Sequence, residues 1–149
     1  MPFRNASWSD ERRRVVLWYE PSFAAGSGEL RKLFPGRPWR PDLVVDVAWA
    51  DGTRDLHVLD AKYRLEAGGP PREALRELWW RYGEGIGDAR GRPVVRSLWV
   101  VAPGDGLWLV APGMMREDWP LERLRGGCVS IGPGSLGALT GPLEVAIRR

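Results

Sequence analysis

The sequence predicts an α/β (α+β) domain, a mixed sheet of four or five strands with one helix packed on one face. Three observations lead to this class. Residues 43–49 and 56–63 form two apolar segments joined by a tight turn, residues 71–86 have the spacing of an amphipathic helix, and residues 94–102 are almost entirely apolar. The order of hairpin, helix and strand is typical of a sheet that a crossover helix covers.

The first 40 residues are predicted to contain one strand between two basic segments. Residues 5–14 are interpreted as a capped helical turn or an arm, and residues 15–23 as a strand. Residues 24–39 are rich in Gly, Pro and Ser, which indicates a loop with at most one helical turn at residues 29–34. Glu20, near the end of the strand, is a candidate for an additional acidic metal ligand, although an ordinary edge-strand carboxylate is the better interpretation.

Both basic segments are candidates for contacts with nucleic-acid phosphates. The alternatives are a solvated arm and a loop whose aromatic residues cap the core. In the loop, Phe34 and Trp39 alternate with basic residues, a pattern that suits backbone contacts with occasional base stacking. The candidate nucleic-acid-binding residues are Arg12, Arg13, Arg14, Arg31, Lys32, Arg37 and Arg40.

The central hairpin carries charged residues at matching ends of its two strands. Asp51-Gly52 is a strong turn signal, and side-chain alternation places Asp60 and Lys62 on one face. An odd loop centred on Gly52 would put Asp42 opposite Lys62 and gather all three side chains. A two-residue turn would put Asp42 opposite Ala61 instead.

Such a cluster supports metal-assisted hydrolysis of phosphodiesters. Two carboxylates bind a hard divalent cation through oxygen, and a nearby ammonium positions the attacking water or offsets developing charge. The competing interpretation is an ordinary ion pair on a sheet face. Only about 0.26 acidic-x-Lys matches are expected by chance, and just two of the 22 Lys and Arg residues are lysines, Lys32 and Lys62.

Two further polar residues lie inside the hairpin strands. With an odd loop, Asp46 shares the face of Asp42, where it binds metal or pairs with an arginine, and the sequence does not choose between these roles. His57, the single histidine, falls on the face opposite Asp60 and is interpreted as a structural residue.

The second half of the chain supplies the helix and the remaining strands. The helical stripe is expected to end between Glu84 and Asp88, with Trp80 off its centre and either exposed for stacking or filling the seam with the sheet. It consists of Ala74, Leu75, Leu78, Trp79, Tyr82 and Ile86. Residues 107–111 are expected to pair with strand 94–102 as a hairpin, and residues 128–131 to form a strand. A short helix is expected at 121–124, and a last turn and strand within 136–147.

Composition restricts the class of protein. The length of 149 residues suits one domain spanning residues 1–149, with 44% hydrophobic and 28% charged residues. No apolar run approaches about 18 residues and no leader pattern begins the chain, so we expect a cytoplasmic protein without membrane contact. A single cysteine and a single histidine exclude an internal disulfide, structural zinc and most Cys/His or Ser/His catalytic sites. A net charge of +3 permits a polyanionic partner.

The motif Pro41-Asp42, followed by a hairpin and Asp60-Ala61-Lys62, resembles the PD-(D/E)XK nuclease superfamily of restriction-endonuclease-like folds. Residues 60–64, DAKYR, are particularly similar to a strand of proteins related to the McrC subunit of McrBC-type restriction systems. Residues 82–86 resemble the helix that follows in those relatives, and residues 98–104 resemble their next strand.

The resemblance implies a Mg²⁺- or Mn²⁺-dependent DNA endonuclease of a restriction or defence system. Asp42 and Asp60 would be metal ligands with the Ala61 carbonyl, and Lys62 the catalytic lysine. DNA is the implied partner, and a nucleotide-driven motor subunit and a homodimer are further expectations. Trp79-Trp80 replaces the relatives' Met-His and no glutamine is present, so the alternative is a non-catalytic nucleic-acid-binding or assembly module that retains the nuclease fold.

Overall fold

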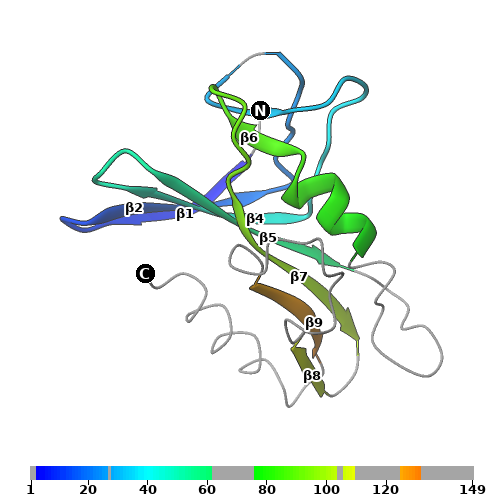
Figure 1. The fold of residues 1–149 in the computed structure, drawn as a ribbon. Coiled ribbons are helices and arrows are strands. Elements are labelled where there is room, and N and C mark those ends of the chain that lie inside the picture. Colours follow the sequence, from blue (N-terminus) through cyan, green and yellow to red (C-terminus); the bar gives the residue numbers. More distant parts are fainter. Residues whose placement is uncertain (1–2, 27, 62–75, 104–105, 110–124, 132–149) are drawn as a thin grey trace.

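The fold is organised around one mixed sheet (Figure 1). The computed structural model describes residues 3–26, 28–61, 76–103, 106–109 and 125–131. Within these residues the sheet has seven strands in the order β1-β2-β4-β5-β7-β9-β8. The strands are β1 Phe3–Ser9, β2 Arg13–Tyr19, β4 Leu43–Trp49, β5 Arg54–Ala61, β7 Val95–Pro103, β8 Gly106–Leu109 and β9 Arg125–Ile131.

The sheet is antiparallel in its first half and mainly parallel in its second. β1, β2, β4 and β5 pair antiparallel, β5 pairs parallel with β7, and β7 pairs parallel with β9. The predicted class, a mixed sheet with a helix on one face, is therefore confirmed. The sheet extends beyond the predicted four or five strands because β1 pairs along β2 and β8 pairs along β9.

The first hairpin corrects the interpretation of residues 5–14 as an arm or a helical turn. β1 and β2 are joined by a turn in which the Asp10 side chain accepts hydrogen bonds from the amides of Arg12 at 2.8 Å and Arg13 at 2.9 Å. These bonds, with help from the neighbouring arginines, lower the pKa of Asp10. A helix N-cap makes the same contacts, so the local sequence alone does not distinguish the two structures.

A two-stranded sheet lies beside the main one. β3 Leu30–Lys32 pairs antiparallel with β6 Ile86–Asp88. The helical turn predicted at residues 29–34 was wrong, as was the helical placement of Ile86. Both segments are extended because each is the other's partner, more than 50 residues away along the chain.

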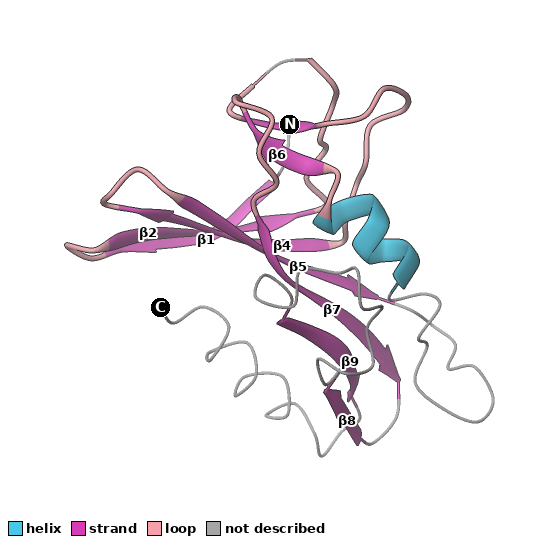
Figure 2. Ribbon diagram, viewed as in Figure 1, coloured by secondary structure: helices cyan, strands magenta, loops and turns pink. Residues whose placement is uncertain are grey.

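The helix lies on one face of the main sheet (Figure 2). Its described part comprises residues 76–78 and the π-helical turn η1, Trp79–Gly83, in which the Glu84 amide donates to the Trp79 carbonyl at 3.1 Å. The helix thus ends at Gly83, one residue before the predicted interval. A Cβ at Gly85 would collide with the Trp39 ring and the Arg81 carbonyl, so this position requires glycine.

The main sheet has an apolar cluster on each face. On the helix face, Val44, Val58 and Leu98 pack against Leu78 and Trp79. On the other face, the cluster comprises Val15, Val45, Val47, Leu59 and Trp99. The alternation predicted for the hairpin strands is therefore confirmed, with even-numbered residues of β4 and β5 facing the helix.

The end of the sheet contains a topological correction. β8 was predicted to form a hairpin with β7, but β8 pairs with β9, and β9 separates it from β7. Both neighbours of β9 are set by long-range pairing.

The strand predicted at residues 128–131 is confirmed as part of β9. The helix predicted at 121–124, the elements within 136–147 and the start of the helix at 71 lie outside the described residues. No helix in the described segments is long and apolar enough to span a bilayer.

Candidate active site

The central hairpin brings Asp42 and Asp60 together at one end of the sheet. Residues 50–53 connect β4 to β5, and the Trp49 amide donates to the Thr53 carbonyl at 2.9 Å, so the pairing continues to these two residues and closes a three-residue loop, 50–52. Gly52 has φ +85°, and its amide donates to the Trp49 carbonyl at 3.0 Å. β4 and β5 pair Leu43 with Leu59 and Val44 with Val58. Continuing this register by one residue places Asp42 opposite Asp60.

Of the two turns that the sequence left open, the odd loop is the one observed, and its centre is Asp51 rather than Gly52. The cause is the left-handed Gly52, which follows the turn as a bulge and shifts the pairing by two residues. A shift of two keeps every side chain on its predicted face. Asp42 therefore shares the face of Asp60, although its partner in the register is not Lys62.

The Asp42 carboxylate is held by the neighbouring strand. The Ala61 amide donates to Asp42 Oδ2 at 2.6 Å, which joins the start of β4 to the last residue of β5. This short, charge-assisted bond fixes the orientation of the carboxylate. Asp42 is half-buried, Asp60 is only 5% exposed, and Asp60 Oδ2 is buried.

Tyr82 of the helix lies within electrostatic range of both carboxylates, although its position in the sequence did not mark it as a site residue. Burial, followed by the charges of Asp60 and Asp42, raises the pKa of the Tyr82 hydroxyl. The helical spacing of Tyr82 placed it only in the apolar stripe. The signal that could have identified it is its hydroxyl group, because an apolar stripe does not need a polar group.

The donor set of this end of the sheet fits a hard divalent cation. Two carboxylates, one of them buried, converge from adjacent strands, and a cation offsets the repulsion between two such charges. Carboxylate and carbonyl oxygens are the ligands that Mg²⁺ and Mn²⁺ take in proteins. The Ala61 amide is used on Asp42, while its carbonyl is the further oxygen that the sequence analysis named. Lys62 lies outside the described residues.

Glu20 lies beside Asp42 on the next strand. Its amide donates to the Asp42 carbonyl at 2.8 Å, and its backbone is left-handed at φ +44°. The Glu20 side chain is exposed. Within the described segments no three His, Cys, Asp or Glu side chains form a group that could hold a metal. Glu20 as an additional ligand stays a prediction.

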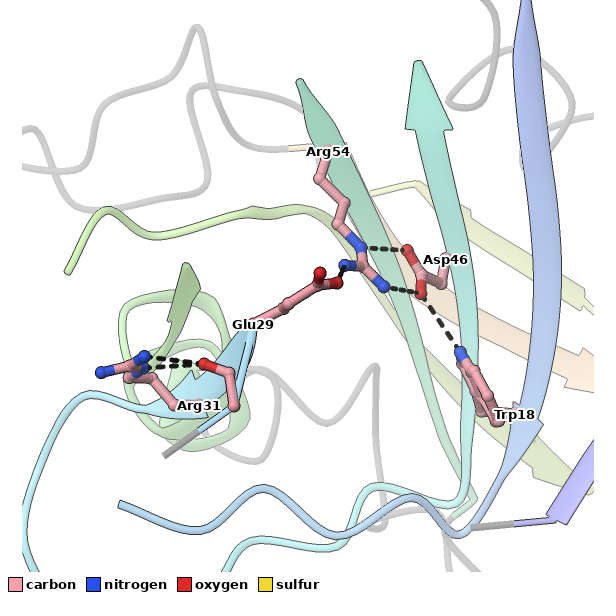
Figure 3. Close-up of polar contacts among 6 residues, drawn as sticks. Trp18, Glu29, Arg31, Asp46 and Arg54 are labelled. Carbon is pink, nitrogen blue, oxygen red and sulfur yellow. Dashed lines mark hydrogen bonds and ion pairs between the residues drawn. The ribbon is translucent and has the colours of Figure 1, made fainter. Parts of the chain in front are cut away.

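Asp46 pairs with an arginine (Figure 3). Arg54 donates from Nε to Asp46 Oδ1 at 2.8 Å and from Nη2 to Oδ2 at 2.6 Å, and the Trp18 indole donates to Oδ2 at 3.2 Å. The hydrogen bonding that Arg54 donates to Asp46 is the main cause that raises the pKa of Arg54. Of the two roles left open by the sequence, the ion pair is the one observed.

His57 occupies the opposite face, as predicted. It is 1% exposed, and its Nδ1 lies 2.7 Å from Ser97 Oγ. The Trp99 indole donates to the same hydroxyl at 2.9 Å. Burial lowers the pKa of His57 to about 4. The buried ring lies on the same face of the sheet as the second cluster.

The two basic segments lie at opposite ends of the sheet. Arg12, Arg13 and Arg14 surround the β1–β2 turn, where Arg13 pairs with Trp49 beside the β4–β5 loop. Asp42 is at the other end of β4, about 20 Å away at roughly 3.3 Å per residue. Arg40 precedes the Pro41-Asp42 dipeptide, and Arg37 and Arg40 are exposed.

Lys32 differs from the other candidates for phosphate contacts. It is 5% exposed, and its ammonium donates to the carbonyls of Pro35 at 3.0 Å and Arg37 at 2.9 Å. The ammonium also lies 4.4 Å from the centroid of the Trp39 ring. The positive charge of Lys32 is therefore compensated inside the loop and is not available to a phosphate group.

Comparison with known proteins gives one family. The family model described as the PD-(D/E)XK nuclease superfamily matches residues 3–105, more than half of the chain. This range contains both carboxylates, the central hairpin, the helix and β7. Neither the curated proteins nor the solved structures give a match.

Proposed function

Since the chain belongs to the PD-(D/E)XK nuclease superfamily, we propose that it is a divalent-metal-dependent endonuclease that hydrolyses phosphodiester bonds in DNA. One observation carries the proposal most directly. Asp42 and Asp60, the two acidic residues of the motif, stand opposite each other on adjacent strands and on the same face of the sheet.

Each residue of the site has a role that follows from its position. Asp42 and Asp60, with the Ala61 carbonyl, would hold Mg²⁺ or Mn²⁺. A bound cation supplies polarisation of the phosphoryl oxygen and acidification of water. The Ala61 amide keeps Asp42 oriented toward the shared site. Lys62 is the proposed catalytic ammonium, which positions the attacking water and offsets the charge developing on phosphate.

The finer assignments complete the proposal. We infer that the chain is related to McrC-type subunits and serves a restriction or defence system, with a nucleotide-driven motor subunit or a second copy of the chain as partner. The resemblance of residues 60–64 to the McrC-related strand supports this. Arg12, Arg13, Arg14, Arg31, Arg37 and Arg40 are the proposed phosphate contacts, and the net charge of +3 agrees with a polyanionic partner.

Nicking of supercoiled plasmid with Mg²⁺ or Mn²⁺ tests the proposal, using Asp60→Asn and the matched variant Asp46→Asn. Both residues are buried acids on the same face of the hairpin. Asp60→Asn should lower cleavage by roughly 10²-fold or more and weaken Mn²⁺ binding measured by calorimetry, because an amide oxygen carries no charge. Asp46→Asn should retain both properties at a temperature where it is folded.

Two outcomes would contradict the endonuclease assignment. One is equal loss in both variants, which would indicate damage to the fold rather than to a metal site. The other is plasmid that stays intact in every metal while the protein still binds DNA. The second outcome would establish the alternative, a non-catalytic nucleic-acid-binding module.

A further inference from the structure

An aromatic row leads from the surface to the candidate active site. Phe34 is 44% exposed and packs edge-on against Trp39, with ring centroids 6.2 Å apart and planes at 66°. Trp39 packs edge-on against Tyr82, again at 6.2 Å. Tyr82 is the helix residue whose hydroxyl experiences the charges of Asp60 and Asp42.

The outer end of the row is held in place by the rest of its loop. The buried Lys32 ammonium binds the carbonyls of Pro35 and Arg37, on both sides of the loop tip. Trp39 exchanges two backbone hydrogen bonds with Phe23, of 2.9 and 3.0 Å, and the Leu33 amide donates to the Gly85 carbonyl at 2.8 Å. These contacts make the loop a preorganised surface.

The position of Phe34 is not explained by the core. Burying a phenylalanine side chain contributes about 1.5 to 3 kcal/mol, yet here the residue stays 44% exposed on a loop that is fixed by other residues. Apart from the buried Lys32, residues 31–40 contain three further cations, Arg31, Arg37 and Arg40, and no acidic residue. An exposed ring within a positive segment suits the stacked bases of a polyanion.

We propose that Phe34 is a stacking platform for an unpaired base of the nucleic-acid substrate, next to the phosphate held at the Asp42–Asp60 site. This inference rests on the proposed function. A base inside a duplex is covered on both faces by its neighbours, so an exposed ring selects a strand that is single or locally opened. Phe34 is joined to Tyr82 through Trp39 by two ring-to-ring steps of 6.2 Å each, which keeps the platform close to the site.

Binding without cleavage tests this platform separately from catalysis. Fluorescence anisotropy in EDTA would compare a labelled 12-nucleotide single strand with a 12-base-pair duplex. The variants are Phe34→Leu, Phe34→Trp and the control Trp8→Leu, which removes a 53% exposed aromatic from β1. Phe34→Leu should weaken binding of the single strand by about 5- to 100-fold, the range for loss of one stacked base. Its effect on the duplex should be under about twofold.

A second readout reports stacking itself. A 2-aminopurine in the single strand should lose fluorescence on binding to the unmodified protein, because stacking quenches it. The quenching should disappear in Phe34→Leu and persist in Phe34→Trp and Trp8→Leu. Equal losses in Phe34→Leu and Trp8→Leu, equal losses on single strand and duplex, or absence of single-strand binding would overturn the platform. A protein that binds with these differences but cuts no plasmid would retain the platform and lose the endonuclease assignment.

Discussion

Arg54 holds Asp46 through two parallel hydrogen bonds of 2.8 and 2.6 Å, and the carboxylate is 2% exposed. Replacing Arg54 by Met would leave a buried charge without its main partner. We expect the free energy of unfolding, measured by urea denaturation, to fall by about 3 kcal/mol. The control is Arg92→Met, because the Arg92–Asp88 pair is 68% and 22% exposed. It should cost less than about 1 kcal/mol, and similar losses in both variants would contradict the assignment of Asp46 to a structural pair.

Lys62 is expected to act on the chemical step. Lys62→Ala should leave Mn²⁺ and DNA binding nearly intact and lower plasmid nicking by roughly 10²-fold or more. Lys62→Arg should not restore activity, because a guanidinium is bulkier and does not exchange its proton near neutral pH. Nicking at the unmodified rate by either variant would remove Lys62 from the mechanism.

The salt dependence of DNA binding should report the arginines at the two ends of the sheet. For a long duplex, Arg37→Ala/Arg40→Ala and Arg12→Ala/Arg14→Ala should each reduce the slope of log K against log salt by about 2, one counterion term per phosphate contact. Arg90→Ala, an exposed arginine outside both segments, is the control and should leave the slope unchanged. An unchanged slope in both double variants would favour a protein partner for the two basic segments.

His57 should make stability depend on pH. Its pKa is lowered from 6.5 to about 4, so the unfolded chain binds a proton that the folded protein excludes. Stability conferred by the neutral ring is complete above pH 6.5 and falls as pH decreases toward 4, by about 3 kcal/mol in total. Urea denaturation across this range should show the decrease, and His57→Gln should show a flatter profile. If the unmodified protein and His57→Gln lost stability equally as the pH falls, His57 would not be the buried group responsible.

Glu20 offers a test of backbone strain together with its candidate role as a ligand. Its φ of +44° is unfavourable for a residue with a Cβ. Glu20→Gly and Glu20→Ala both remove the carboxylate, but only glycine relieves the strain. The glycine variant should therefore be more stable than the alanine variant by about 1 kcal/mol. We expect both variants to retain Mn²⁺ affinity, and a shared loss would identify Glu20 as a third ligand.

Local periodicity was sufficient to predict the central hairpin, the face of Asp60, and the crossover to β7, whereas the face of Asp42 depended on the length of the loop. The first three depend on side-chain alternation or on helical spacing, which neighbouring residues determine. The centre of the β4–β5 loop was not predictable in this way, because an Asp-Gly pair is compatible with loops of different lengths and Gly52 adopts a bulge conformation. The shift of two residues changed the partner of Asp42 and preserved its face.

Long-range pairing accounts for the predictions that were wrong. β3 is a strand because β6 pairs with it, and β8 pairs with β9 rather than with β7. The scarcity of lysine was an argument for Lys62 and did not indicate the surroundings of Lys32. Lys32 binds two carbonyls and lies over Trp39, a packing arrangement that residue counts do not contain.

The insertion of β9 between β7 and β8 has a consequence for protein production. The family match ends at residue 105, and a chain cut there would lack β9, which pairs with β7 from Ser97 to Pro103. Such a fragment would keep both carboxylates but present the backbone of an apolar strand along an open edge, a template for self-association. During synthesis the same edge of β7 stays unpaired until the residues of β9, up to residue 131, have left the ribosome. The last strand of the parallel half thus covers an edge that would otherwise be open to a second chain.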